Sequence, residues 1–256
     1  MNKIILPAAV FCGFPVAAFA DTYPEFNINV LSVMQANNSK ADPILGTGTK
    51  DKDLTTYQFE HFSTFKYGDI YLDAELYEGN QVGGPGAGSG GGNTSSQNLL
   101  VANPRLSLGK MTGRSFAFGP VSDVSLIARW ERASYGDFRS RNYGVSLNFN
   151  VPGFLYFESG LLQRTTNYND PNWLWRSYLI SKPWEIAGQQ FNFTLLSLIN
   201  GTDHNGTEYF TRPEVLWHVD KAGAFQLGVR VETHHYQIAG DGYERITPQL
   251  IFKWFL

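Results

Sequence analysis

The sequence has 256 residues and a formal net charge of −3 at pH 7; 17% of its residues are charged and 15% are aromatic. This balance lacks the basic excess of nucleic-acid-binding proteins, so we expect no nucleic-acid partner. Mean hydropathy is −0.23, and residues 21–256 contain no apolar run of about 18 residues, the length that a membrane-spanning helix needs. Many aromatic residues at near-neutral mean hydropathy are typical of strands whose lipid-facing and lumen-facing residues alternate.

The first twenty residues have the features of a secretory signal peptide. Lys3 precedes an apolar run over residues 4–19, which ends in the small-residue pattern Ala18-Phe19-Ala20. We therefore expect residues 1–20 to be removed, which leaves 21–256 as the mature chain. The single cysteine, Cys12, lies in the removed segment, so we expect no disulfide and no thiolate metal site. Loss of Lys3 leaves 19 of the 20 basic residues against 23 acidic ones.

Twelve segments of the mature chain alternate apolar and polar side chains with the period of two that β-strands have. They cover residues 24–35, 55–67, 69–79, 99–110, 122–134, 139–151, 154–166, 172–182, 189–200, 207–218, 224–238 and 244–256. This even number predicts an all-β protein, a transmembrane antiparallel up-and-down β-barrel of 12 strands over residues 21–256. A soluble secreted sandwich would show the same alternation and is the alternative fold.

The last segment shows the two faces clearly, because Leu250, Phe252 and Trp254 alternate with Gln249 and Lys253. A strand in lipid cannot leave its backbone groups unpaired at an edge of the sheet. We therefore expect this strand to pair with the first one and close the barrel.

The connections between the segments indicate an orientation. Tight turns fall at one end of the barrel, at residues 67–69, 152–153 and 220–223. The long connections 37–54 and 80–98 fall at the other end. Short turns face the periplasm in bacterial barrels, so we expect both termini there, in the outer membrane of a Gram-negative bacterium. The Gly-rich stretch 83–92 lacks the Lys-Ser/Thr pair and helix start of a phosphate-binding loop, so we predict a flexible surface loop.

Two stretches of the sequence carry a family resemblance. They are residues 59–71 (FEHFSTFKYGDIY) and 103–113 (NPRLSLGKMTG). Both resemble the nucleoside-specific channel-forming proteins, the Tsx family, and their relatives called outer membrane protein K; the rest of the mature chain resembles them in strand number and layout. The resemblance implies a monomeric twelve-stranded outer-membrane barrel whose narrow lumen binds and passes nucleosides. The Gly-rich loop and the final Leu256, where the family usually has an aromatic residue, depart from its pattern.

The inward face of the predicted strands carries tyrosines and charges of both signs, whereas a general anion pore would carry mostly one sign. Nucleosides suit such a lining, because bases stack on Tyr and Arg planes while ribose hydroxyls bond to charged groups. We expect the substrate-binding residues to be Tyr71, Arg105, Arg129, Glu131, Tyr156, Glu158, Arg212, Glu214, Arg230, Glu232 and Tyr236. The alternation also turns inward Arg164, Arg176, Tyr178, Arg245 and Lys253. The alternative for each charged residue is an Arg–Glu pair that only holds the barrel together.

Three acidic residues, Asp69, Asp73 and Glu75, share the inward face of the third predicted strand. Their mutual repulsion requires arginines on neighbouring strands, and Arg105 is a candidate. Carboxylates along one straight strand rarely converge on one ion, so we expect no metal site. The five histidines form no metal-ligand pattern either, and we expect no cofactor.

His61 and Ser63 lie two residues apart on the predicted lipid face of the second strand. A His-x-Ser pair on the outside of a twelve-stranded barrel is similar to the dyad of outer membrane phospholipase A, but residues 64–66 here differ from that family's Asn-Gly-Arg. The sequence names no third polar group and no oxyanion donors. We therefore predict a channel and no enzyme. A lipid-modifying enzyme and a plugged structural or phage-receptor barrel are the alternatives.

Overall fold

The computed structural model describes residues 27–38, 51–82, 94–134, 137–202, 206–238 and 241–256. The predicted signal peptide and the Gly-rich stretch 83–92 lie outside the described residues. Twelve strands form the barrel: β1 (Asn27–Asn38), β2 (Asp51–Phe65), β3 (Gly68–Val82), β4 (Thr94–Ser107), β5 (Val121–Ala133), β6 (Arg139–Phe149), β7 (Phe154–Thr166), β8 (Asn172–Ser181), β10 (Gln189–Gly201), β11 (Thr207–His218), β12 (Phe225–Ile238) and β13 (Asp241–Phe255).

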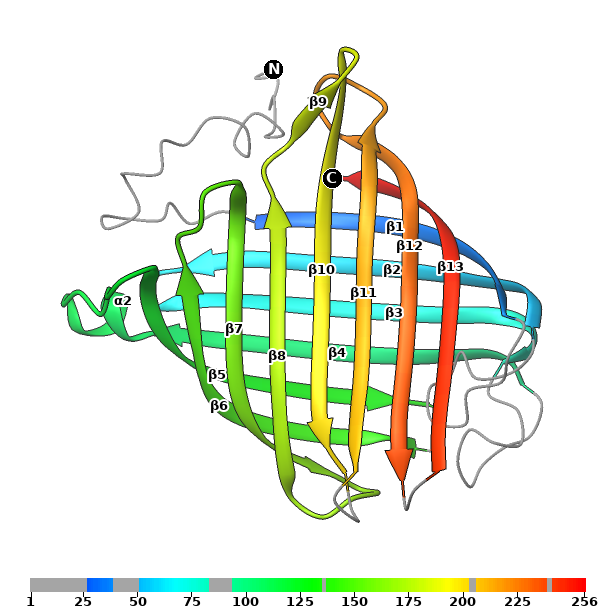
Figure 1. The fold of residues 1–256 in the computed structure, drawn as a ribbon, viewed down its shortest axis with the longest axis horizontal. Helices are drawn as coiled ribbons and strands as arrows, with labels where there is room; N and C mark the ends of the chain where they lie inside the picture. Colours follow the sequence, from blue (N-terminus) through cyan, green and yellow to red (C-terminus); the bar gives the residue numbers. More distant parts are fainter. Residues whose placement is uncertain (1–26, 39–50, 83–93, 135–136, 203–205, 239–240) are drawn as a thin grey trace, which may run out of the picture.

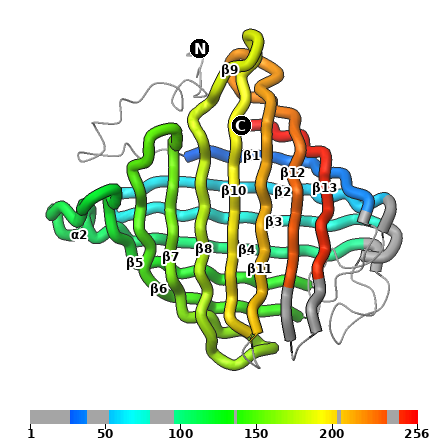
Figure 2. Tube along the Cα trace, in the orientation of Figure 1, coloured from blue at the N-terminus to red at the C-terminus, as the bar shows by residue number. Residues whose placement is uncertain are grey.

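The sheet closes on itself, as the last segment of the sequence predicts. Each strand pairs antiparallel with its neighbour in the chain, and β13 returns to β1 with Val30 opposite Phe255. In Figures 1 and 2, β1 to β4 cross behind β8 and β10 to β13, which is the appearance of strongly tilted strands on opposite walls of a barrel. The 12-stranded barrel is confirmed.

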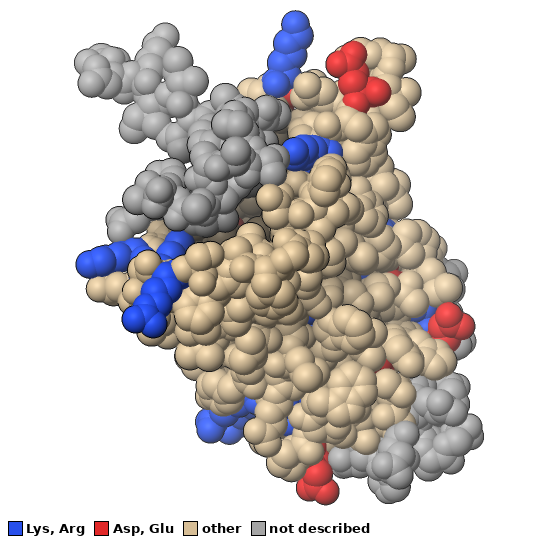
Figure 3. All heavy atoms as spheres, turned by 60° about the vertical axis from the view of Figure 1, so that its left-hand side comes forward, with Lys and Arg blue, Asp and Glu red and all other residues tan. Residues whose placement is uncertain are grey.

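Side chains alternate between a lipid face and a luminal face. On β13, Leu250 is 69% exposed, whereas the next residue, Ile251, is 2% exposed. Figure 3 shows a broad outer surface of uncharged residues, with Lys, Arg, Asp and Glu side chains mainly towards its margins. An apolar exterior around a charged interior is the pattern of an outer-membrane barrel, so the protein belongs in the cell outer membrane. No helix among the described residues has the length and apolar character to cross a membrane.

Tight turns lie at one end of the barrel, which we call the turn end. There β2 joins β3, β6 joins β7 and β11 joins β12. Gly153 in the second of these turns has φ 88°, a conformation that suits glycine. Gly68 starts β3 beside the backbone of β4, where an added Cβ would lie 1.8 Å from the carbonyl oxygen of Arg105. Both glycines are required by backbone geometry.

The predicted fourth strand is too long at the turn end. β4 ends at Ser107, and a short helix, α2 (Leu108–Thr112), replaces the predicted strand residues up to 110. The helix starts where the Ser107 hydroxyl accepts a hydrogen bond from the Lys110 backbone N–H at 3.0 Å. Gly113 ends it with φ 66°.

A further strand was not predicted. β9 (Trp184–Ile186) pairs only with the first residues of β10 and extends that hairpin beyond the barrel. The turn between them contains Ala187 and Gly188, both with positive φ, as two-residue hairpin turns require. Two barrel strands also start earlier than predicted, β2 at Asp51 and β4 at Thr94.

Candidate functional site in the barrel lumen

The lumen contains a cavity of about 1630 Å³, lined by side chains from all twelve barrel strands. Ordinary ligand pockets measure about 300–1,000 Å³, so this space is large enough for a small solute together with water. Its walls differ in chemistry around the circumference.

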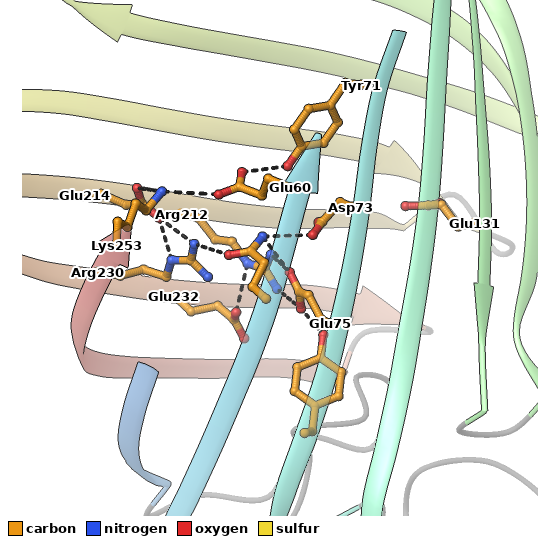
Figure 4. Close-up of polar contacts among 12 residues, drawn as sticks. Glu60, Tyr71, Asp73, Glu75, Glu131, Arg212, Glu214, Arg230, Glu232 and Lys253 are labelled. Carbon is orange, nitrogen blue, oxygen red and sulfur yellow. Dashed lines mark hydrogen bonds and ion pairs between the residues drawn. The ribbon is translucent and has the colours of Figure 1, made fainter. Parts of the chain in front are cut away.

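One side of the cavity is a network of charged side chains, which we call the ionic cluster (Figure 4). Arg212 on β11 forms an ion pair with Glu75 on β3. Between these strands lie β12, β13, β1 and β2, so the pair crosses the lumen. Arg212 Nε also donates to Glu232 at 2.9 Å. The cluster comprises Gln58, Glu60, Asp73, Glu75, Arg212, Glu214, Arg230, Glu232 and Lys253.

Shared partners hold the ionic cluster together. Glu214 accepts from Arg230 Nε at 2.6 Å and from Lys253 Nζ at 2.8 Å. Gln58 then links two charges, because its side-chain oxygen accepts from Arg230 at 2.9 Å and its amide donates to Asp73 at 2.9 Å. Asp73 makes no ion pair with any described residue, so its carboxylate is the least compensated group of the cluster.

Aromatic rings and their own arginines form a second group beside the turn end. The rings of Tyr156 on β7 and Tyr178 on β8 are 6.0 Å apart at 57°. Arg105 lies over the Tyr156 ring at 5.5 Å, and Arg176 lies over Tyr178 at 5.9 Å. Glu158 is fully buried and forms an ion pair with Arg176, so it holds that guanidinium beside the ring. We call Tyr156, Tyr178 and these two arginines the aromatic group.

Apolar side chains line the cavity next to the aromatic group. Leu174 on β8 packs with Ile127 and Leu162, and Leu198 on β10 packs against the same cluster. We call the residues of this kind that reach the cavity the apolar wall: Leu174, Leu196, Leu198 and Phe210. The sequence predicts charges and tyrosines on the lumen, and it does not indicate this wall.

The structure divides the predicted site residues into separate groups. Arg212, Glu214, Arg230 and Glu232 meet in the ionic cluster, and Tyr71 joins them through a 2.8 Å hydrogen bond to Glu60. Arg105 and Tyr156 belong to the aromatic group, and Glu158 lies beside it, paired with Arg176. Arg129 and Glu131 pair with each other at 2.7 Å, apart from both. The side chain of Tyr236 lies outside the described residues.

Several luminal residues were left out of the predicted site. Gln58 and Glu60 alternate along β2 with the lipid-facing Tyr57 and Phe59, so they face the lumen. This alternation is the sequence signal that could have identified them. Lys253, Arg176 and Tyr178 were predicted to face inward, which is confirmed, but not assigned to the site.

The acidic row on β3 is only partly neutralised by ion pairs. Asp69 pairs with Arg105 at 2.6 Å, so the predicted relief by a neighbouring strand is confirmed there. Glu75 instead pairs with Arg212 from across the lumen, whereas Asp73 accepts from the amide of Gln58 and has no ion pair with a described residue. Among the described residues, no group of three or more His, Cys, Asp or Glu side chains is placed to hold a metal ion.

His61 and Ser63 lie on the lipid side of β2. His61 Nδ1 is 2.8 Å from the side-chain oxygen of Asn29, directly opposite on β1, so a third polar group is present that the sequence does not reveal. No hydrogen bond joins His61 to Ser63 in the described part of the chain. The contact that would activate a nucleophile is therefore missing.

By sequence, the chain matches no protein-family model and no curated protein. Solved structures of similar fold include several outer-membrane proteins, among them porins. A KdgM porin in complex with disordered oligogalacturonate is 6% identical, with a TM-score of 0.48 and coverage of 90% of this chain and 98% of that one. Omp33 of Acinetobacter baumannii is 8% identical (TM-score 0.40, 91% and 98% covered), and a BenF-like porin of Pseudomonas fluorescens Pf-5 is 10% identical (0.41, 91% and 98%). Likenesses this distant carry no information on the solute of this chain.

Proposed function

We propose that the protein is an outer-membrane channel that passes nucleosides by substrate-selective facilitated diffusion. The observation that carries this proposal is the two-sided cavity, in which the ionic cluster shares one space with the aromatic group and the apolar wall. The sharp resemblance of residues 59–71 and 103–113 to nucleoside-specific channels supports the choice of solute, and Tyr71 and Arg105 within those stretches are luminal.

A nucleoside has a planar base and a ribose with hydroxyl groups, and the cavity offers a partner to each. The base can stack on Tyr156 or Tyr178, in rings already arranged beside guanidinium groups. Ribose hydroxyls can donate to Asp73, whose carboxylate has no ion-pair partner among the described residues. The Arg212–Glu75 link crosses the lumen, so solutes pass beside it, along the apolar wall. Weak binding at successive groups then suffices for passage, with no cofactor or energy source.

Uptake into proteoliposomes tests the proposal. We expect labelled adenosine to enter faster than a sugar or a neutral amino acid of similar size. Tyr156→Ala removes one stacking partner worth about 1–3 kcal/mol, so adenosine binding should weaken about ten- to a hundredfold. The matched control is Tyr57→Ala, since Tyr57 lies on the lipid face at 45% exposure.

Two outcomes would contradict the proposal. Equal slow rates for every solute would reject selectivity and favour a plugged barrel. Lipid hydrolysis by the purified protein that is lost in Ser63→Ala would favour the enzyme alternative.

A further inference from the structure

Five basic side chains line the cavity at its turn end: Lys66, Lys110, Arg114, Lys182 and Lys221. We call this set the basic vestibule. Lys66 comes from the β2–β3 turn, Lys110 and Arg114 from the α2 region, Lys182 from the end of β8 and Lys221 from the β11–β12 turn. The charges are therefore distributed around the mouth of the barrel. Figure 3 is turned so that this end comes forward, and Lys and Arg side chains project there.

Acidic residues near the basic vestibule already form hydrogen bonds or ion pairs with groups other than the vestibule cations. Asp123 accepts from the Ser107 hydroxyl and the Gly109 N–H. Asp220 accepts two backbone N–H groups of its own turn, from Ala222 at 3.2 Å and Phe225 at 2.8 Å. The nearby carboxylate of Asp69 is paired with Arg105 of the aromatic group.

Most of the vestibule cations are left uncompensated. Lys66, Arg114, Lys182 and Lys221 form no ion pair with a described residue. Lys110 differs, because its Nζ lies 3.4 Å from the Gly68 carbonyl oxygen and partial burial lowers the pKa of its ammonium. Deeper in the lumen the pattern is the opposite, since the arginines there are paired with carboxylates.

The aromatic group lies directly inside this mouth. Tyr156 is the third residue of β7 counted from the β6–β7 turn, and Arg105 is two residues from the end of β4. On the next strand, Tyr178 precedes Lys182 by four residues, about 13 Å of extended chain. A solute whose ring rests on these tyrosines therefore has its other end within reach of the vestibule cations.

We propose that the basic vestibule collects organic anions, and that the channel takes aromatic solutes carrying a phosphate or carboxylate group in addition to neutral ones. Four cations without an ion pair among the described residues stand around the mouth of a cavity with low-dielectric walls, and such an arrangement raises the local concentration of anions and their rate of capture. The proposal rests on the proposed channel function, because it supposes that solutes traverse the lumen. A nucleoside monophosphate is the probe that combines a base for the aromatic group with a phosphate for the vestibule.

The experiment compares adenosine with adenosine monophosphate in the same proteoliposomes, and measures reversal potentials in planar bilayers under a KCl gradient. The test variant is Lys66→Gln/Lys182→Gln/Lys221→Gln. The matched control is Arg132→Gln/Arg139→Gln/Arg141→Gln, three exposed cations near the opposite end that do not line the cavity. Both variants lose three positive charges, so any general effect of net charge is shared.

We expect wild type to favour chloride over potassium and to take up the monophosphate. The test variant should lose about tenfold in monophosphate uptake, as expected when electrostatic capture is removed, with adenosine uptake unchanged. The difference should fade near 1 M salt, where the Debye length falls to about 3 Å. The control should behave as wild type.

Each contrary result has a distinct meaning. Monophosphate uptake and reversal potential equal in the test variant and wild type would overturn the vestibule proposal alone, as would exclusion of the monophosphate by a wild type that passes adenosine. Chloride preference and monophosphate uptake without faster adenosine passage would support the vestibule and reject nucleoside selectivity. A barrel that conducts neither ions nor adenosine would overturn both.

Discussion

The two sides of the lumen are held by different interactions. On the ionic side, each charge has its place fixed by a directional bond, as Arg230 is by Glu214. On the other side, Leu174 and Leu198 pack with their neighbours without any directional bond. A solute can rest against Leu174 and Leu198 without breaking a hydrogen bond or an ion pair, whereas on the ionic side it must compete with existing ion pairs. This comparison predicts that solutes pass along the apolar wall. It also predicts that solutes are selected by polar groups of the ionic cluster that can still accept or donate a hydrogen bond.

The strongest test of this comparison is Arg212→Ala. This change leaves Glu75 and Glu232 buried without their shared cation. Removing one partner from a buried ion pair costs about 3–5 kcal/mol, so the free energy of unfolding should fall by about that amount. The link across the lumen would also be lost, and single-channel conductance should rise. Urea unfolding in lipid vesicles and bilayer recordings provide the two measurements.

A double variant serves as the control for this change. Glu75→Gln together with Arg212→Gln removes both charges of the link and should recover part of the lost stability. Conductance equal to wild type in Arg212→Ala would show that the link does not obstruct the lumen.

Apolar-wall truncation is expected to have a smaller effect. Leu198→Ala removes contacts with the Ile127, Leu162 and Leu174 cluster. Buried Leu→Ala changes cost 2–5 kcal/mol, and because Leu198 is only partly buried we expect about 2 kcal/mol, with ion selectivity unchanged. Leu250→Ala on the lipid face is the matched control, measured by the same urea unfolding. An altered chloride-to-potassium preference in Leu198→Ala would mean that the two sides are not independent.

The ionic side could be predicted in part from the sequence, and the apolar wall could not. A charged residue in an alternating strand identifies its own face, which is why Arg212, Glu214 and Arg230 were correctly predicted to face inward. Their partners depend on strand stagger, which a sequence does not reveal, and Arg212 pairs with a residue 137 positions away. In β10 the residues around Leu196 are apolar on both faces, so no alternation marks the luminal ones.

Asp73→Asn is expected to have the smallest effect on stability. Its effect on solute affinity should depend on the ribose hydroxyls. Asp73 has no ion pair among the described residues, and asparagine keeps an oxygen that can accept from Gln58. The free energy of unfolding should therefore not fall, because the substitution removes a buried charge that has no ion-pair partner among the described residues. A hydrogen bond from a ribose hydroxyl to a charged acceptor is worth about 1.5–3 kcal/mol. The neutral asparagine amide retains only part of this free energy, so adenosine affinity should fall about tenfold. 2′,3′-Dideoxyadenosine, which lacks the hydroxyls of the ribose ring, should lose nothing from the substitution. If both solutes lost affinity equally, Asp73 would act through the shape of the ionic cluster and would not contact the ribose.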